Sequence, residues 1–148
     1  MKMRAVMTVA VGMTLGLAGP AFAKNIEVKM NTKGTGGVPY TFEPAFVKAA
    51  VGDTVTFVPS DPTHNGELIK GMVPAGVTPA KGAMGKPFVL NVTKPGLYGV
   101  ECLPHFSMGM VGLVQAGAGP SPNLVAVKAI KLPPLAGKRM APLLAQAK

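Results

Sequence analysis

The sequence YGVECLPHFSMGMVGLVQ, residues 98–115, places a short loop rich in sulfur and imidazole between two apolar runs. Residues 98–102 predict a strand, because Tyr98, Val100 and Cys102 alternate and so share one face. Residues 111–115 predict the next strand. The residues between them therefore form a tight connection between two consecutive strands.

The rest of the chain repeats this pattern of short strands and turns. Alternating or β-branched runs predict strands around residues 26–30, 54–58, 68–69 and 88–93. Glycine and proline punctuate loops at residues 32–39 and 71–86, and residues 42–50 are a mixed apolar segment. Seven or so short strands predict an all-β sandwich or barrel. The tail, residues 122–148, changes to helical spacing and predicts two short helices, the second opening at Pro133-Pro134.

The first 23 residues predict a secretory signal peptide. Lys2 and Arg4 precede an apolar run that ends in Ala21-Phe22-Ala23, so we expect cleavage before Lys24. A membrane anchor is the alternative, but the run is shorter than the roughly 20 residues a spanning helix needs. The remaining domain, residues 24–148, keeps 13 of the 15 basic residues against 6 acids, a net charge of +7 in place of +9. We expect a soluble protein outside the cytoplasm, without membrane insertion.

The loop carries the chemistry. Cys102 is the single cysteine of the chain, so no internal disulfide can form in the oxidising space outside the cytoplasm. His105, Met108 and Met110 follow within eight residues, and the only other histidine, His64, stands just past a predicted strand end. One thiolate, two imidazoles and one thioether form the donor set of an electron-transfer copper site. The spacing leaves Met108 and Met110 equally possible as the thioether.

Other interpretations of these residues carry different chemistry. Taken singly, each could be a buried cysteine, a solvated histidine or a core methionine. A zinc site usually completes its tetrahedron with another Cys, His or carboxylate, which this set lacks. A cysteine nucleophile with a histidine base would need a better geometry than Cys102 and His105 on one tight loop. A copper-storage or copper-delivery protein remains an alternative that keeps the metal.

The chain resembles the pseudoazurins, a family of small periplasmic blue copper proteins among the cupredoxins. The likeness covers nearly all of residues 24–148, and its matching stretches are Phe42-Glu43-Pro44-Ala45, Gly52 to Phe57, His64-Asn65, Ile69 to Met72, Tyr98-Gly99-Val100 and Cys102 to Gly112. The resemblance implies an eight-stranded Greek-key β-sandwich with two short C-terminal helices. It also assigns copper to His64, Cys102, His105 and Met110, with Met108 as a non-ligand, and it implies a hydrogen bond from the backbone N–H of Asn65 to the sulfur of Cys102.

The resemblance implies a periplasmic one-electron carrier and not an enzyme. Its expected partners are a copper nitrite reductase as acceptor and a small cytochrome as donor, with no nucleic acid, and a monomer is the expected state. We expect His64 and Cys102 to be buried and His105 to present its ring edge to solvent as the route of the electron. Met108 and Pro104 should surround that edge with an apolar patch, to which Met72 and Pro74 are further candidates.

The charges near the site give a mixed prediction. Lys33 and Lys81 fit the lysines with which the family surrounds its patch, and they should steer acidic partners towards it. Pro62 stands where a lysine is common, and Glu101 places an acid directly before Cys102. Ser107 stands where glycine or a similarly small residue is usual, two residues after the predicted ligand His105.

Overall fold

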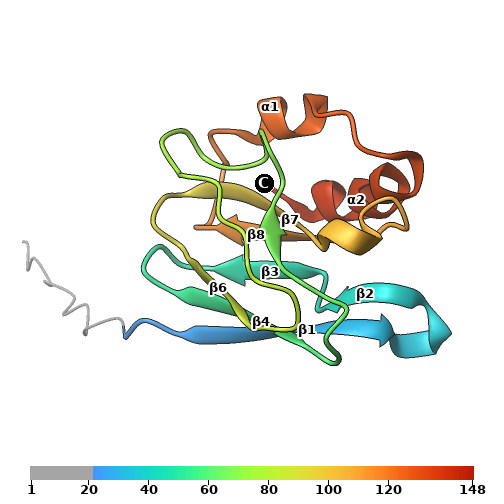
Figure 1. The fold of residues 1–148 in the computed structure, drawn as a ribbon. Helices are drawn as coiled ribbons and strands as arrows, with labels where there is room; N and C mark the ends of the chain where they lie inside the picture. Colours follow the sequence, from blue (N-terminus) through green and yellow to red (C-terminus); the bar gives the residue numbers. More distant parts are fainter. Residues whose placement is uncertain (1–21) are drawn as a thin grey trace, which may run out of the picture.

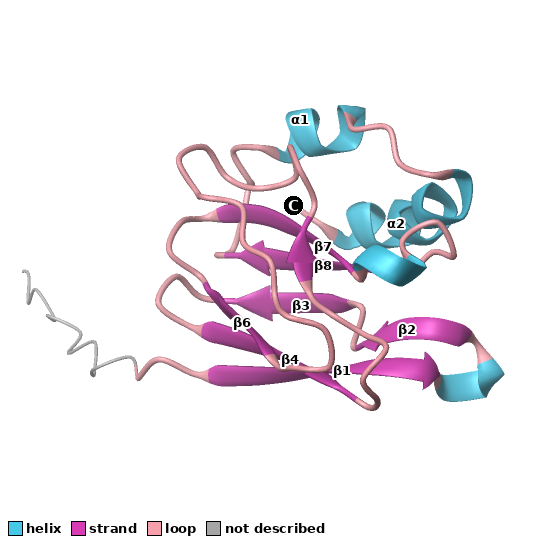
Figure 2. Ribbon diagram, in the orientation of Figure 1, coloured by secondary structure: helices cyan, strands magenta, loops and turns pink. Residues whose placement is uncertain are grey.

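The structure is a computed structural model that describes residues 22–148. Eight strands form two sheets of four that pack face to face (Figures 1 and 2). The first sheet has the order β2-β1-β4-β6, with β2 (Pro39–Glu43), β1 (Asn25–Lys33), β4 (Thr54–Pro59) and β6 (Phe88–Asn91). The second has the order β3-β8-β7-β5, with β3 (Phe46–Ala49), β8 (Val111–Ala116), β7 (Gly96–Glu101) and β5 (Glu67–Leu68). This confirms the predicted eight-stranded sandwich.

Strand direction is mixed in both sheets. β1 pairs with β4 and β3 pairs with β8 in parallel, whereas the other neighbours are antiparallel. The main core lies between the sheets and contains Val28, Met30, Phe42, Val55, Phe57 and Tyr98, each no more than 1% exposed. Val28 and Met30 alternate with exposed residues along β1, as the sequence pattern predicts.

Two helices cover the outer face of the second sheet (Figure 2). They are α1 (Leu124–Ala129) and α2 (Pro134–Gln146), and α2 begins at Pro134 as predicted. Ala136 and Met140 of α2 pack with Leu113 of β8 in a second apolar cluster. All residues of β7 and β8 are therefore buried, since one face of each strand meets the sandwich core and the other meets the helices.

Residues 42–50, expected as one mixed apolar segment, divide between two sheets. β2 pairs with β1, while β3 crosses to pair with β8. A short 3₁₀ helix (Thr35–Gly37) joins β1 to β2, and another (Leu103–His105) follows β7. The expected signal peptide lies outside the described residues apart from its last two, so its cleavage stays a prediction. Within the described residues, no helix has the length and apolar character that crossing a bilayer requires.

Candidate metal centre

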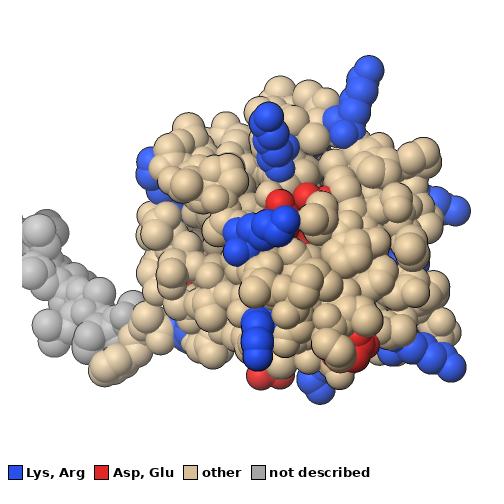
Figure 3. Space-filling view, viewed as in Figure 1, with Lys and Arg blue, Asp and Glu red and all other residues tan. Residues whose placement is uncertain are grey.

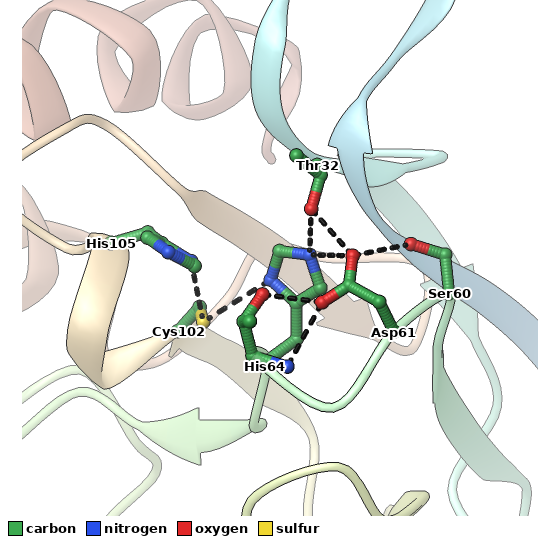
Figure 4. Close-up of polar contacts among 7 residues, drawn as sticks. Thr32, Ser60, Asp61, His64, Cys102 and His105 are labelled. Carbon is green, nitrogen blue, oxygen red and sulfur yellow. Dashed lines mark hydrogen bonds and ion pairs between the residues drawn. The ribbon is translucent and has the colours of Figure 1, made fainter.

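Three donor atoms from two distant segments meet in the interior. The Sγ of Cys102 lies 3.7 Å from Nδ1 of His64 and 3.5 Å from Nδ1 of His105 (Figure 4). The three donor atoms all lie within 4.8 Å of one another. Cys102 and His64 are fully buried, and His105 is 8% exposed. The fold thus brings together the three residues that the sequence had proposed.

These separations fit one metal ion held by all three side chains. A bond of about 2.0 Å to nitrogen and about 2.3 Å to sulfur, set at about 120°, places the sulfur about 3.7 Å from the nitrogen. The observed 3.7 and 3.5 Å agree with that requirement. One soft thiolate and two imidazoles form the equatorial set of a blue copper site. The donor set therefore suits copper in both its chemistry and its spacing.

The loop from Cys102 to Met110 is closed by its own backbone hydrogen bonds. The N–H of Cys102 donates to the carbonyl of Met110 at 3.1 Å, and the N–H of Met110 donates to the carbonyl of His105 at 3.1 Å. The N–H of His105 donates in turn to the carbonyl of Cys102 at 3.0 Å. Met110 is fully buried, whereas Met108 is 43% exposed. Burial and these contacts favour Met110 over Met108, a choice that sequence spacing had left open.

Asp61 and Thr32 fix the orientation of the His64 ring, and sequence reasoning had given neither a role. The hydroxyl of Thr32 donates to Oδ2 of Asp61 at 2.5 Å, and it also lies 3.0 Å from Nε2 of His64. Because that hydroxyl uses its hydrogen on Asp61, it accepts from Nε2–H. Nε2 is also 3.4 Å from Oδ2 of Asp61. The proton therefore sits on Nε2, and the lone pair of Nδ1 faces Cys102.

The surroundings shift the pKa values of four titratable groups at the site. Hydrogen bonds from Thr32 and then Thr63 hold the pKa of Asp61 far below its usual range, so the carboxylate is charged. Burial lowers the pKa values of both His64 and His105, which favours the neutral imidazoles that bind metals. Burial raises the pKa of the Cys102 thiol, against the opposing hydrogen bonds from the backbone N–H groups of Asn65 and His105. The Asn65 contact matches the one that the family resemblance implied.

His105 is less open to solvent than expected, because an aromatic ring covers it. The ring of Tyr40 in β2 stacks on the imidazole with centroids 4.0 Å apart and planes 18° from parallel. Only 8% of His105 is exposed, so the expected solvent-facing ring edge is reduced to a small opening. Nothing in the local sequence of residues 38–42 points to the ligand loop, and only the fold places Tyr40 there.

The apolar surface near the site has different members from those predicted. Met72 and Pro74 are buried. Met72 packs on Gly99, and a Cβ built on Gly99 would lie only 2.8 Å from the Cβ of Met72. The expectation that Met72 and Pro74 line the patch is wrong, because Gly99 leaves room for Met72 in the core. Pro104 and Met108 are exposed as expected, and Leu103 joins them at 48% exposure.

Comparison with known proteins agrees with this geometry. The pattern of the family described as copper binding proteins, plastocyanin/azurin family, matches residues 28–117. The pseudoazurin of Paracoccus pantotrophus is 52% identical over 132 residues, which cover 89% of this chain and 90% of the relative. The chain belongs to the pseudoazurin family. The expectation of copper as cofactor is confirmed, and pseudoazurins are electron-transfer proteins and not enzymes.

Crystal structures of other pseudoazurins have the same fold. That of the Methylobacterium extorquens AM1 protein is 43% identical and superposes with a TM-score of 0.78 over 82% of this chain and 98% of that chain. The protein from Hyphomicrobium denitrificans is also 43% identical, with a TM-score of 0.79 over 84% of this chain and 98% of that chain. The pseudoazurin fold, with its two C-terminal helices, therefore extends over the described domain.

Proposed function

We propose that this protein is a periplasmic one-electron carrier whose copper is held by His64, Cys102, His105 and Met110. The observation that carries the proposal is the convergence of one buried thiol and two imidazole Nδ1 atoms at distances that suit a single ion. The buried Met110 adjoins them through its hydrogen bonds to Cys102 and His105. Its thioether would be the fourth ligand.

The protein residues hold this site in one geometry. When bound, copper supplies a one-electron couple between Cu(II) and Cu(I). Asp61 and Thr32 orient His64, the loop hydrogen bonds fix His105 and Met110, and burial keeps water from the donor atoms. Ligands that are already in place need little rearrangement between the two states. The same rigidity suits a carrier better than a catalyst, since no substrate has to enter.

The surface above His105 suits brief contact with redox partners. Leu103, Pro104 and Met108 of the ligand loop itself are exposed and apolar, as expected for a small and transient interface. We propose periplasmic acceptors such as a copper nitrite reductase, and cytochrome-like donors, met by a monomer. Basic side chains are scattered singly over the face shown in Figure 3. The Nζ of Lys81 lies 3.6 Å from Oε2 of Glu67, and this ion pair weakens the contribution of Lys81 to steering.

A pair of methionine variants tests the ligand assignment. Copper(II) added to the full-length protein should give an intense thiolate-to-copper absorption that bleaches reversibly on reduction. Met110→Leu should change that spectrum and the reduction potential, because it would remove the thioether ligand. Met108→Leu, two residues away but exposed, should leave both unchanged. Equal effects of the two substitutions would contradict the assignment.

The same sample separates a carrier from the storage or delivery alternative. A carrier should cycle repeatedly between its coloured and colourless states without losing copper to a competing chelator. A colourless copper(II) complex, or copper lost at each reduction, would favour storage or delivery. Sequencing the exported protein tests the periplasmic location: an N-terminus at Lys24 supports it, and an intact Met1 contradicts it.

A further inference from the structure

Arg139 of α2 reaches three backbone carbonyls from two other parts of the chain. Its Nη1 donates to the carbonyl of Pro39 at 3.0 Å, that of Tyr40 at 2.8 Å and that of Gly109 at 3.2 Å. Pro39 and Tyr40 belong to β2, and Gly109 belongs to the ligand loop. Nη1 carries two N–H groups, so two of the three carbonyls share one of its hydrogens. One half-buried side chain thus joins α2, β2 and the loop.

The contact at Tyr40 lies where the backbone has an unusual conformation. Tyr40 has a φ of +53°, which is uncommon for a residue with a bulky side chain. Such conformations persist where surrounding contacts hold them. The carbonyl of this same residue accepts the shortest of the three Arg139 hydrogen bonds, and its ring is the one that stacks on His105. The backbone contact and the position of the ring are therefore linked through one residue.

The contact at Gly109 lies directly before Met110. Gly109 has a φ of +86°, and a Cβ built there would lie 2.8 Å from Cδ of Arg139 and 3.0 Å from Cγ of Leu135. The stem of Arg139 therefore packs closely on this glycine while its Nη1 binds the glycine carbonyl. Two kinds of contact, packing and a hydrogen bond, therefore fix the loop just before Met110.

We propose that Arg139 is a positioning residue of the metal centre. It acts through Tyr40, whose ring it holds over His105, and through Gly109, whose carbonyl it fixes before Met110. Among the residues that the structure describes, no carboxylate forms an ion pair with Arg139. Its donors therefore serve the three carbonyls. The inference rests on the proposed copper site for its spectroscopic consequences, but its structural content concerns Tyr40, His105 and Gly109 and does not depend on the metal.

Three variants of α2 test this role. Arg139→Gln removes the guanidinium, Arg139→Lys keeps the positive charge, and Lys138→Gln removes a charge from the adjacent residue, which is exposed. In the metal-free protein, the ring current of Tyr40 should shift the ring protons of His105 upfield in proton NMR spectra. Arg139→Gln should lose most of that shift, and Lys138→Gln should retain it. Arg139→Lys should recover little of it, because the lysine side chain is shorter and its ammonium lacks the fixed plane that aims Nη1 at the three carbonyls.

The copper-loaded proteins provide a second measurement. Arg139→Gln should change the absorption spectrum and the reduction potential, whereas Lys138→Gln should match the wild type. Wild-type values for Arg139→Gln in both measurements would overturn the inference, and so would full recovery in Arg139→Lys, because charge alone would then account for the effect. If Arg139→Gln does not fold, Arg139→Lys provides the comparison, and its identity with wild type would overturn the inference. A wild-type protein without blue absorption would refute the copper proposal instead, while the metal-free NMR comparison would still decide the role of Arg139.

Discussion

Glu101, the residue before Cys102, is a buried acid whose removal should stabilise the protein at neutral and alkaline pH. Its side chain is 8% exposed, and its Oε2 has no hydrogen-bond partner among the described residues. Glu67 of β5 lies directly opposite it in the antiparallel pairing with β7. Burial, and then the charge of Glu67, raise the pKa of Glu101 from 4.5 to about 7, with Lys81 opposing. The folded protein therefore favours the neutral acid.

The size of the effect follows from that shift in pKa. A rise from 4.5 to about 7 corresponds to about 3 kcal/mol between the two protonation states. Because the folded pKa is the higher one, the stabilisation is fully present below about pH 4.5 and is lost as the pH rises through 7. Glu101→Gln cannot ionise, so it avoids this loss. Its free energy of unfolding relative to wild type should rise by about 2 to 3 kcal/mol between pH 5 and pH 8.

Urea unfolding of the metal-free, reduced protein measures this difference at each pH. Glu27→Gln is the matched control, because it removes the same type of side chain from an exposed position on β1. The reasoning is refuted if wild type and Glu101→Gln differ by the same free energy at pH 5 and pH 8. A stability gain shared by Glu27→Gln would point to net charge in place of burial.

Three further predictions concern the metal site. Asp61→Asn should weaken copper binding about 10- to 100-fold in competition with a chelator, because the charged acceptor that orients His64 is lost; an unchanged midpoint would exclude that role. His105→Gly should let added imidazole restore the copper spectrum, and a spectrum without response to imidazole would argue against His105 as a ligand. Copper loading at pH 7 should release about one proton, read with an indicator dye in weak buffer, because burial raises the pKa of the Cys102 thiol. Loading without proton release would mean that the thiolate already exists in the metal-free protein.

The strands that the sequence predicts well are those with a local signal. β1, β4 and β6 alternate buried and less buried residues, and β7 and β8 are apolar runs bounded by turns. β2 and β3 escaped prediction because the mixed apolar residues 42–50, interrupted by Pro44, show no clear alternation. The two strands also pair in different sheets. Their existence depends on β1 and β8, which lie elsewhere in the sequence.

The residues of the metal centre also differ in how well the sequence predicts them. Cys102, His105 and Met110 lie within nine residues, so their chemistry and spacing are visible in one stretch of sequence. Asp61 precedes His64 by three residues and could have been suspected as its acceptor, because metal-binding histidines commonly donate to a carboxylate. The exposure of Met72 was predicted wrongly, since its place in the core depends on the missing side chain of Gly99. The sequence therefore predicts the donor residues, but it does not predict which residues pack around them.

Tyr40 and Arg139 show why the residues that pack around the ligands cannot be predicted from the sequence. Tyr40 is 65 residues from His105, and Arg139 is separated by 99 residues from the carbonyl of Tyr40. Tyrosine and arginine are common residue types, and Arg139 donates its side-chain hydrogen bonds to backbone carbonyls. Composition and spacing therefore predict neither contact. The fold creates them by placing β2 beside the ligand loop and α2 against β8. A pseudoazurin chain can therefore present the same four proposed ligands and still differ in its spectrum and potential, because those properties also depend on residues that reach the site only through tertiary packing.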